Sequence, residues 1–422
     1  MAFGSVQTAG EIAQRVMEHL AFDAGLCTRQ LSPRSKCQKC ADICPVDAIS
    51  IERSSTPGFM ADMNLDEDAC IECGLCTLAC PTSAFSWQNP TFMQLRNKSA
   101  KACEAGEGKV YLTCDKTGIK EFSSTVISVP CLGMIPWEFW LSLQSDYEGK
   151  FAIYLPDGLC EHCEVTSGEE QIFEQVGQAE ESSGIAIELQ NNKRELEFFK
   201  RAQSEGYDAG RRGFFTEIKA ASKMVGNIAL ETAIGAPEKI KPRSTQDRYN
   251  SQREYEKELK AQESEDAQES EHAEYVPLGA TAILTPRRKI LLETLKRHPE
   301  LANFVPVVLP SVNKNCTDCK ACAYLCPSEA ITIGSEGIQM SPKFCTGCIL
   351  CQEICWPKAI EFEERNGLVF SDARPYNMRQ KGVVGTSNMT GGQPNKLNSH
   401  FANSNSISAK LFNSELIDED KS

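Results

Sequence analysis

The chain has 422 residues, enough for two to four compact domains. Acidic residues outnumber basic ones by 58 to 44, and the formal net charge of −14 argues against a nucleic-acid partner, whose phosphates need a basic face. No stretch of the sequence approaches 18 consecutive apolar residues, so we expect no transmembrane segment.

The first 26 residues lack the basic start, apolar run and cleavage site of a signal peptide. Their apolar residues, from Val6 to Leu20, recur at helical spacing and predict an amphipathic helix. We therefore expect a cytoplasmic protein, and in a reducing compartment its 21 cysteines indicate metal binding rather than disulfides.

Eight cysteines lie between residues 27 and 80, in two copies of one spacing. The later copy reads Cys70-x2-Cys73-x2-Cys76-x3-Cys80 and is followed by a proline. Three closely spaced thiolates wrap three iron corners of a [4Fe–4S] cube, while the fourth cysteine of such a run reaches the neighbouring cluster. The spacing therefore predicts one cluster held by Cys70, Cys73, Cys76 and Cys44.

The earlier copy is irregular. It reads Cys37-x2-Cys40-x3-Cys44, and Arg34 stands where its first cysteine is expected. Cys27 lies upstream, across a proline-containing insert of nine residues, and we favour it as the fourth ligand of a cluster with Cys37, Cys40 and Cys80. The alternative is a three-cysteine cluster that is [3Fe–4S] or has a labile iron. The basic residues of the insert either are solvated or raise the potential of this cluster.

Further along, short apolar runs rich in β-branched and aromatic residues precede Cys114, Cys131 and the pair Cys160 and Cys163. Helix-like stretches at Pro136–Gln144 and Glu169–Ala179 separate or follow these runs. Alternating strands and helices predict a parallel sheet, and functional groups gather beyond the carboxyl ends of its strands. We therefore expect the four cysteines to share one site.

Two segments of this region, residues 129–135 (VPCLGMI) and 158–163 (GLCEHC), resemble motifs of the delta subunit of methyl-viologen-reducing hydrogenase. The resemblance covers residues 109–168 and implies an electron-relaying [2Fe–2S] cluster on the four cysteines. The chain departs from that family in having Met134 where an arginine is usual and no cysteine beside Cys114. Zinc and a metal-free thiol site stay open as alternatives. His162 is expected to be a spacer, and Cys103 is left over.

A cysteine-free stretch follows, and its residues 239–274 are charged and poor in apolar side chains, which is typical of a linker. An apolar helix is predicted at Arg287–Leu301. After Ser371 the chain is rich in Asn, Ser and Gly, and we expect it to be disordered.

The last eight cysteines form a second block, whose two copies start 29 residues apart: Cys316-x2-Cys319-x2-Cys322-x3-Cys326 and Cys345-x2-Cys348-x2-Cys351-x3-Cys355. The same geometry pairs Cys355 with the first triplet and Cys326 with the second, giving two more [4Fe–4S] clusters. Zinc modules instead use pairs of CxxC separated by about 12–20 residues. Trp356, inserted before Pro357, is expected to alter packing beside the cluster and not its ligation.

The C-terminal block resembles bacterial two-cluster ferredoxins over residues 305–362, and the N-terminal block resembles ferredoxin-type accessory proteins of respiratory enzymes such as periplasmic nitrate reductase. These resemblances imply an α+β chain of the polyferredoxin kind. We expect bis-[4Fe–4S] domains of (βαβ)2 type at residues 1–100 and 301–370. Between them we expect an α/β domain at 105–190 and a helical, charged linker at 191–300, with a disordered tail at 371–422.

The sequence thus predicts a carrier of low-potential electrons, working with a redox enzyme of hydrogenase, formate dehydrogenase or flavoprotein type. It contains no dinucleotide, Walker, HExxH or GxSxG motif, so we expect no catalysis by this chain alone. An accessory protein for assembly of an anaerobic oxidoreductase and a redox sensor are the alternatives.

Overall fold

The computed structural model describes residues 19–54, 60–106, 108–119, 123–198, 282–334, 337–371 and 375–379. The expected N-terminal helix, the charged stretch at 239–274 and the tail beyond residue 379 lie outside them. The chain divides into two compact units, Met1–Asn191 with Arg243–Ser422 and Asn192–Pro242. All the cysteines belong to the first unit.

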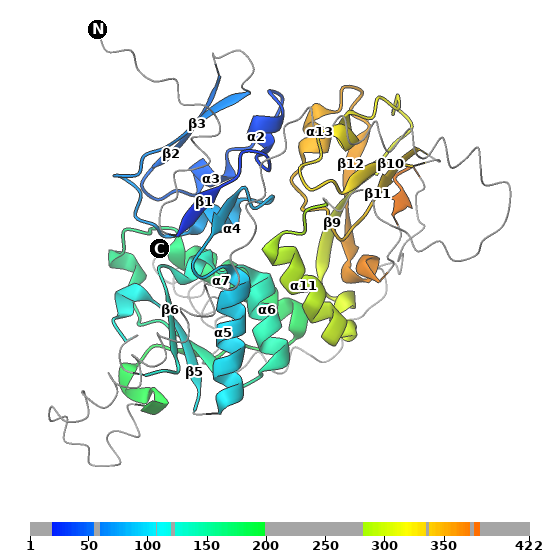
Figure 1. Cartoon of the computed structure of the whole chain (residues 1–422). Coiled ribbons are helices and arrows are strands. Elements are labelled where there is room, and N and C mark those ends of the chain that lie inside the picture. The colour runs from blue at the N-terminus through cyan, green and yellow to red at the C-terminus, as the bar shows by residue number, and fades with distance from the viewer. Residues whose placement is uncertain are drawn as a thin grey trace, which may run out of the picture. The chain divides into compact units, whose positions relative to one another are not determined.

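Two antiparallel strand pairs build the N-terminal block (Figure 1). They are β1 (Leu20–Phe22) with β4 (Phe85–Trp87), and β2 (Ile49–Arg53) with β3 (Ala61–Leu65). Strands β2 and β4 follow Cys44 and Cys80, the last cysteine of each copy. Three short helices carry or follow cysteines: α2 (Thr28–Leu31), α3 (Lys39–Asp42) and α4 (Leu75–Ala79).

The middle region contains a four-stranded parallel sheet with strand order β6-β5-β7-β8. Every residue of β5 and β7 is buried, as in parallel strands covered on both faces. The predicted strands and helices of this region are confirmed. The elements are β5 (Val110–Cys114), β6 (Val126–Val129), β7 (Phe151–Tyr154), β8 (Leu189–Gln190), α5 (Phe92–Ala105), α6 (Trp137–Asp146) and α7 (Gly168–Ser183).

Helix α11 (Pro286–Arg297) belongs to this core and not to a linker. Ile290 and Leu291 are each 1% exposed and lie in the same apolar cluster as the sheet. The predicted apolar helix is therefore present, but it packs in the core, whereas the sequence placed it within a linker at 191–300.

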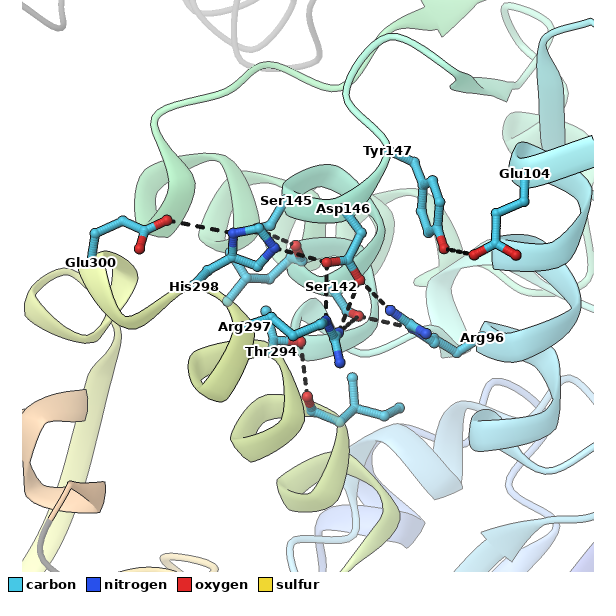
Figure 2. Close-up of polar contacts among 12 residues, drawn as sticks. Arg96, Glu104, Ser142, Ser145, Asp146, Tyr147, Thr294, Arg297, His298 and Glu300 are labelled. Carbon is cyan, nitrogen blue, oxygen red and sulfur yellow. Dashed lines mark hydrogen bonds and ion pairs between the residues drawn. The ribbon is translucent and has the colours of Figure 1, made fainter. Parts of the chain in front are cut away.

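A polar network anchors the end of α11 to α5 and α6 (Figure 2). The Asp146 carboxylate accepts hydrogen bonds from Arg297 (2.9 and 3.1 Å) and His298 (2.8 Å), and it also contacts Arg96. Burial alone would raise the Asp146 pKa, but the hydrogen bonds from Arg297 and His298 lower it below its ordinary value.

The C-terminal block has the same kinds of element as the N-terminal block. β9 pairs with β12, and β10 pairs with β11, which also pairs with a short β13. Helices α12 (Ala321–Tyr324) and α13 (Leu350–Ile354) each carry a cysteine. The strands are β9 (Pro306–Val312), β10 (Ile331–Gly334), β11 (Gly337–Met340), β12 (Ile360–Asn366) and β13 (Tyr376–Asn377).

The start of the expected disordered tail is ordered. Tyr376 and Asn377 form β13, and Met378 is 1% exposed. The prediction of disorder was wrong for these residues, because a two-residue strand leaves no periodic signal in a sequence rich in polar residues.

Candidate iron–sulfur sites

The first four-thiol set lines a small apolar cavity in the N-terminal block. Its cysteines are Cys27, Cys37, Cys40 and Cys80, and Phe22, Ile51, Met63 and Phe85 complete the wall. Burial raises the pKa of Cys27 to about 11, and the nearby thiols of Cys80 and Cys37 contribute to this shift. The structure therefore places Cys27 beside the three cysteines with which the sequence grouped it.

The second set brings Cys44 across to the later triplet. Burial raises the pKa of the Cys76 thiol well above its ordinary value, and the thiols of Cys73, Cys70 and Cys44 add to this shift. Cys44 Sγ also accepts a hydrogen bond from the Ala48 amide, at 3.3 Å. An amide aimed at the sulfur favours its ionised, metal-binding form.

The C-terminal block contains two further sets. The thiol of Cys326 lies close enough to the triplet Cys345, Cys348 and Cys351 to raise the pKa of each. The other four cysteines line a second apolar cavity of equal size: Cys316, Cys319, Cys322 and Cys355. The equal cavities in the two blocks suit the same occupant.

The crossing cysteines of the two blocks have matching hydrogen bonds. As Ala48 does for Cys44, the Ala359 amide donates to Cys355 Sγ, at 3.2 Å. The other two crossing cysteines each lie beside a hydroxyl group two residues on, in Cys80 with Thr82 (3.5 Å) and Cys326 with Ser328 (3.7 Å). Hydrogen bonds to cluster sulfurs are among the means by which proteins set cluster potentials.

A fifth set lies at the carboxyl edge of the parallel sheet. Cys114 ends β5, Cys131 follows β6, and Cys160 and Cys163 lie in the loop after β7. Burial raises the pKa of Cys131 and of Cys160 to about 12, and mutual thiol contacts contribute to both shifts. The sheet thus brings together the four cysteines as the strand pattern predicted, while His162 is exposed.

The sets adjoin one another. In the N-terminal block the thiol of Cys40 contributes to the pKa of Cys76, and in the C-terminal block Cys322 contributes to that of Cys351. The middle set borders the second N-terminal set, because Cys73 raises the pKa of Cys131 and both pack with Leu75 in one apolar cluster.

All 21 cysteines lie in described residues, and all are free of disulfides. Cys103, 3% exposed, lies apart in the apolar core, where burial raises its pKa to about 11. Within the described ranges, no three Cys, His, Asp or Glu side chains converge closely enough to hold one metal ion. Two of the four-thiol sets instead line small apolar cavities.

Sequence reasoning missed two arginines beside cysteines. Arg288, on α11, donates to the Cys345 carbonyl at 2.7 Å and lies over the Phe370 ring. Arg379 reaches Cys316 Sγ at 3.6 Å from the segment expected to be disordered. The only available signal was their charge, in segments that were interpreted as linker and tail.

Comparison with known proteins supports the thiol chemistry. Residues 34–84 match the family model of a 4Fe-4S dicluster domain, a match that begins after Cys27. An uncharacterized ferredoxin-like protein of Haemophilus influenzae is 38% identical over 50 residues, which are 10% of this chain and 58% of that protein. Ferredoxin Fdx2 of Sorangium cellulosum is 33% identical over 66 residues, which are 13% of this chain and 65% of that protein.

The matches therefore span less than two thirds of these curated relatives. No solved structure matches the chain. In the described part of the chain, no helix has the length and apolar character needed to span a bilayer. Residues 34–84 therefore form a 4Fe-4S dicluster domain, and short stretches of the chain are similar to ferredoxins.

Proposed function

We propose that this chain is a multi-centre electron carrier that passes low-potential electrons to or from a redox enzyme. Four [4Fe–4S] clusters would be held by the four thiol sets of the two blocks, and a [2Fe–2S] centre by the set at the sheet edge. Such clusters supply reversible one-electron chemistry. The chain would supply the thiolates, the apolar walls and the hydrogen bonds to sulfur.

The observation that carries this proposal is the adjacency of the thiol sets. The Cys40 and Cys76 pair, the Cys322 and Cys351 pair, and the Cys73 and Cys131 pair each join two sets. A storage or purely structural metal site has no need of neighbours, whereas an electron carrier does.

The assignment of Cys27 as a ligand rests on its place in the wall of the first cavity. Its thiol is 8% exposed and lies at the start of α2, near Cys80 and Cys37. A three-cysteine cluster would leave this buried thiol with no role beside three ligands.

Zinc suits the geometry less well than a cluster does. A single zinc ion needs all four sulfurs about 2.3 Å from one point. Within the described residues, no three Cys, His, Asp or Glu side chains are arranged to hold one such ion.

The deciding experiment is anaerobic purification of the full chain with analysis of iron, acid-labile sulfide and zinc, followed by reductive titration monitored by electron paramagnetic resonance. We expect about 16–18 iron atoms per chain, as four cubes and one smaller centre require. Stoichiometric zinc without sulfide would overturn the proposal. Stable binding to an enzyme's cluster-free form alone would indicate an assembly role, and partner binding that switches on exposure to air would indicate a sensor.

A further inference from the structure

We propose that the nine-residue insert between Cys27 and Cys37 is a docking element that holds the N-terminal block against helix α13 of the C-terminal block. Polar contacts join the insert to α13. Arg34 Nη1 donates to the Ile354 carbonyl at 3.3 Å, and the Lys36 amide donates to Glu353 Oε1 at 3.1 Å. Both acceptors lie on α13, and both donors lie in the insert.

Apolar packing strengthens the same contact. Leu31, 5% exposed, forms one cluster with Leu350 and Ile354, and Cys348 packs at its edge. A leucine is buried here only because the other block covers it. The first N-terminal thiol set is thereby brought towards the thiol sets of the C-terminal block.

The insert itself is built as a rigid platform. The Ser35 hydroxyl lies 3.0 Å from that of Thr28, and Arg29 Nη1 donates to the Ser35 carbonyl at 2.6 Å. Its first residues, Thr28 and Arg29, line the first thiol cavity, while Arg34 and Lys36 face α13. One short segment therefore joins a thiol set on one side to a second domain on the other.

The irregular features of the two blocks meet at this contact. Arg34 stands at the expected place of a cysteine, and Trp356 is the residue inserted after Cys355. The Arg34 guanidinium lies 5.9 Å from the Trp356 ring centroid, a cation–π geometry. Trp356 is 80% exposed, so it does not pack inside its own block. The irregular residue of each block therefore contacts the irregular residue of the other block.

This docking deepens the proposed function, because electrons can cross between the blocks only where the blocks stay together. Arg34 acts here as a positioning residue. Its contacts with α13 set the approach of the blocks, and it donates nothing to a thiol within the described residues.

The test is hydrogen–deuterium exchange by mass spectrometry on the full chain, purified without oxygen, in Arg34→Ala, Trp356→Ala and the double variant. We expect the peptide containing Lys36 and the α13 peptide to exchange about tenfold faster in Arg34→Ala, which loses a hydrogen bond and the ring contact. Trp356→Ala should raise the exchange rate of the same peptides about two- to fivefold. In the Arg34→Ala background, Trp356→Ala should not increase the exchange rate of these peptides further.

The matched controls are Arg53→Ala and Phe304→Ala, an exposed arginine and an exposed aromatic residue elsewhere on the two blocks, and both should leave these peptides unchanged. Unchanged exchange in Trp356→Ala, or a full Trp356→Ala effect in the double variant, would overturn the docking. Trp356 is exposed, so its variant folds even if Arg34→Ala does not. Iron analysis of the same samples separates this outcome from failure of the proposed function.

Discussion

Met134 lies so close to Gly74 that a Cβ atom on Gly74 would be 2.8 Å from both Sδ and Cε of the methionine. Gly74 follows Cys73 of the second N-terminal set, and Met134 lies three residues after Cys131 of the middle set. The contact therefore fixes the approach of these two thiol sets.

Gly74→Ala should destabilise the chain by about 2–4 kcal/mol, because Gly74 has φ of +81° and the added methyl group would collide with Met134. Thermal unfolding of the anaerobic protein measures this. The matched control is Gly118→Ala, where φ is +64° but nothing lies within 4 Å of the added atom. Equal losses in the two variants would show that the contact with Met134 carries no weight.

Cys27→Ser should remove about one to four irons per chain and change one cluster signal, because the first set would lose a ligand. Iron analysis and paramagnetic resonance of the reduced protein report this. Cys103→Ser is the control, since Cys103 is buried away from every set and should leave iron content unchanged. Full iron content in Cys27→Ser would show that the cluster needs only three cysteines.

Cys131→Ser should abolish a spectroscopic signal different from those of the cubes, since Cys131 lies among the four thiols at the sheet edge. The signal from the second N-terminal set should shift without being lost, because Cys73 borders Cys131. Paramagnetic resonance spectra of the two reduced proteins at matched concentration test both expectations. An unaltered set of signals means that the middle region holds no cluster.

The Asp146 network should make the chain lose stability in acid. The folded state lowers the Asp146 pKa below 3.8, so this contribution is complete above the unfolded value and fades as pH falls through the folded one. When unfolding in denaturant is measured at pH 7 and pH 3, the free energy of unfolding should fall less for Asp146→Asn than for the unchanged chain. Parallel pH curves for the two proteins would exclude the effect.

Much of the cysteine arrangement could be predicted because ligand spacing is a local property. The strands ending at Cys114 and before Cys131 were predicted from short apolar runs, and a parallel sheet was predicted from the alternation of strands and helices over the whole region. Cys27 was grouped with Cys37 by reach alone, and the structure places it in the same cavity wall.

What the sequence could not reveal depends on distant contacts. Arg34 and Ile354 are 320 residues apart, and nothing near either residue indicates the other. Helix α11 was predicted as a helix, but its packing against the core through Ile290 and Leu291 depends on elements far away in the sequence. Trp356 was expected to alter packing beside its cluster, and its contact with Arg34 could not be predicted from the sequence.

The separation of Arg34 from Ile354 has a consequence for biosynthesis. A chain leaves the ribosome from its N-terminus, and domains generally fold in that order. Until residue 354 has emerged, Leu31 and the donors around it face water or chaperones, and the N-terminal block lacks one of its walls. Nascent chains halted before α13 should therefore expose an apolar surface that the finished protein hides, so that only completed molecules escape quality control.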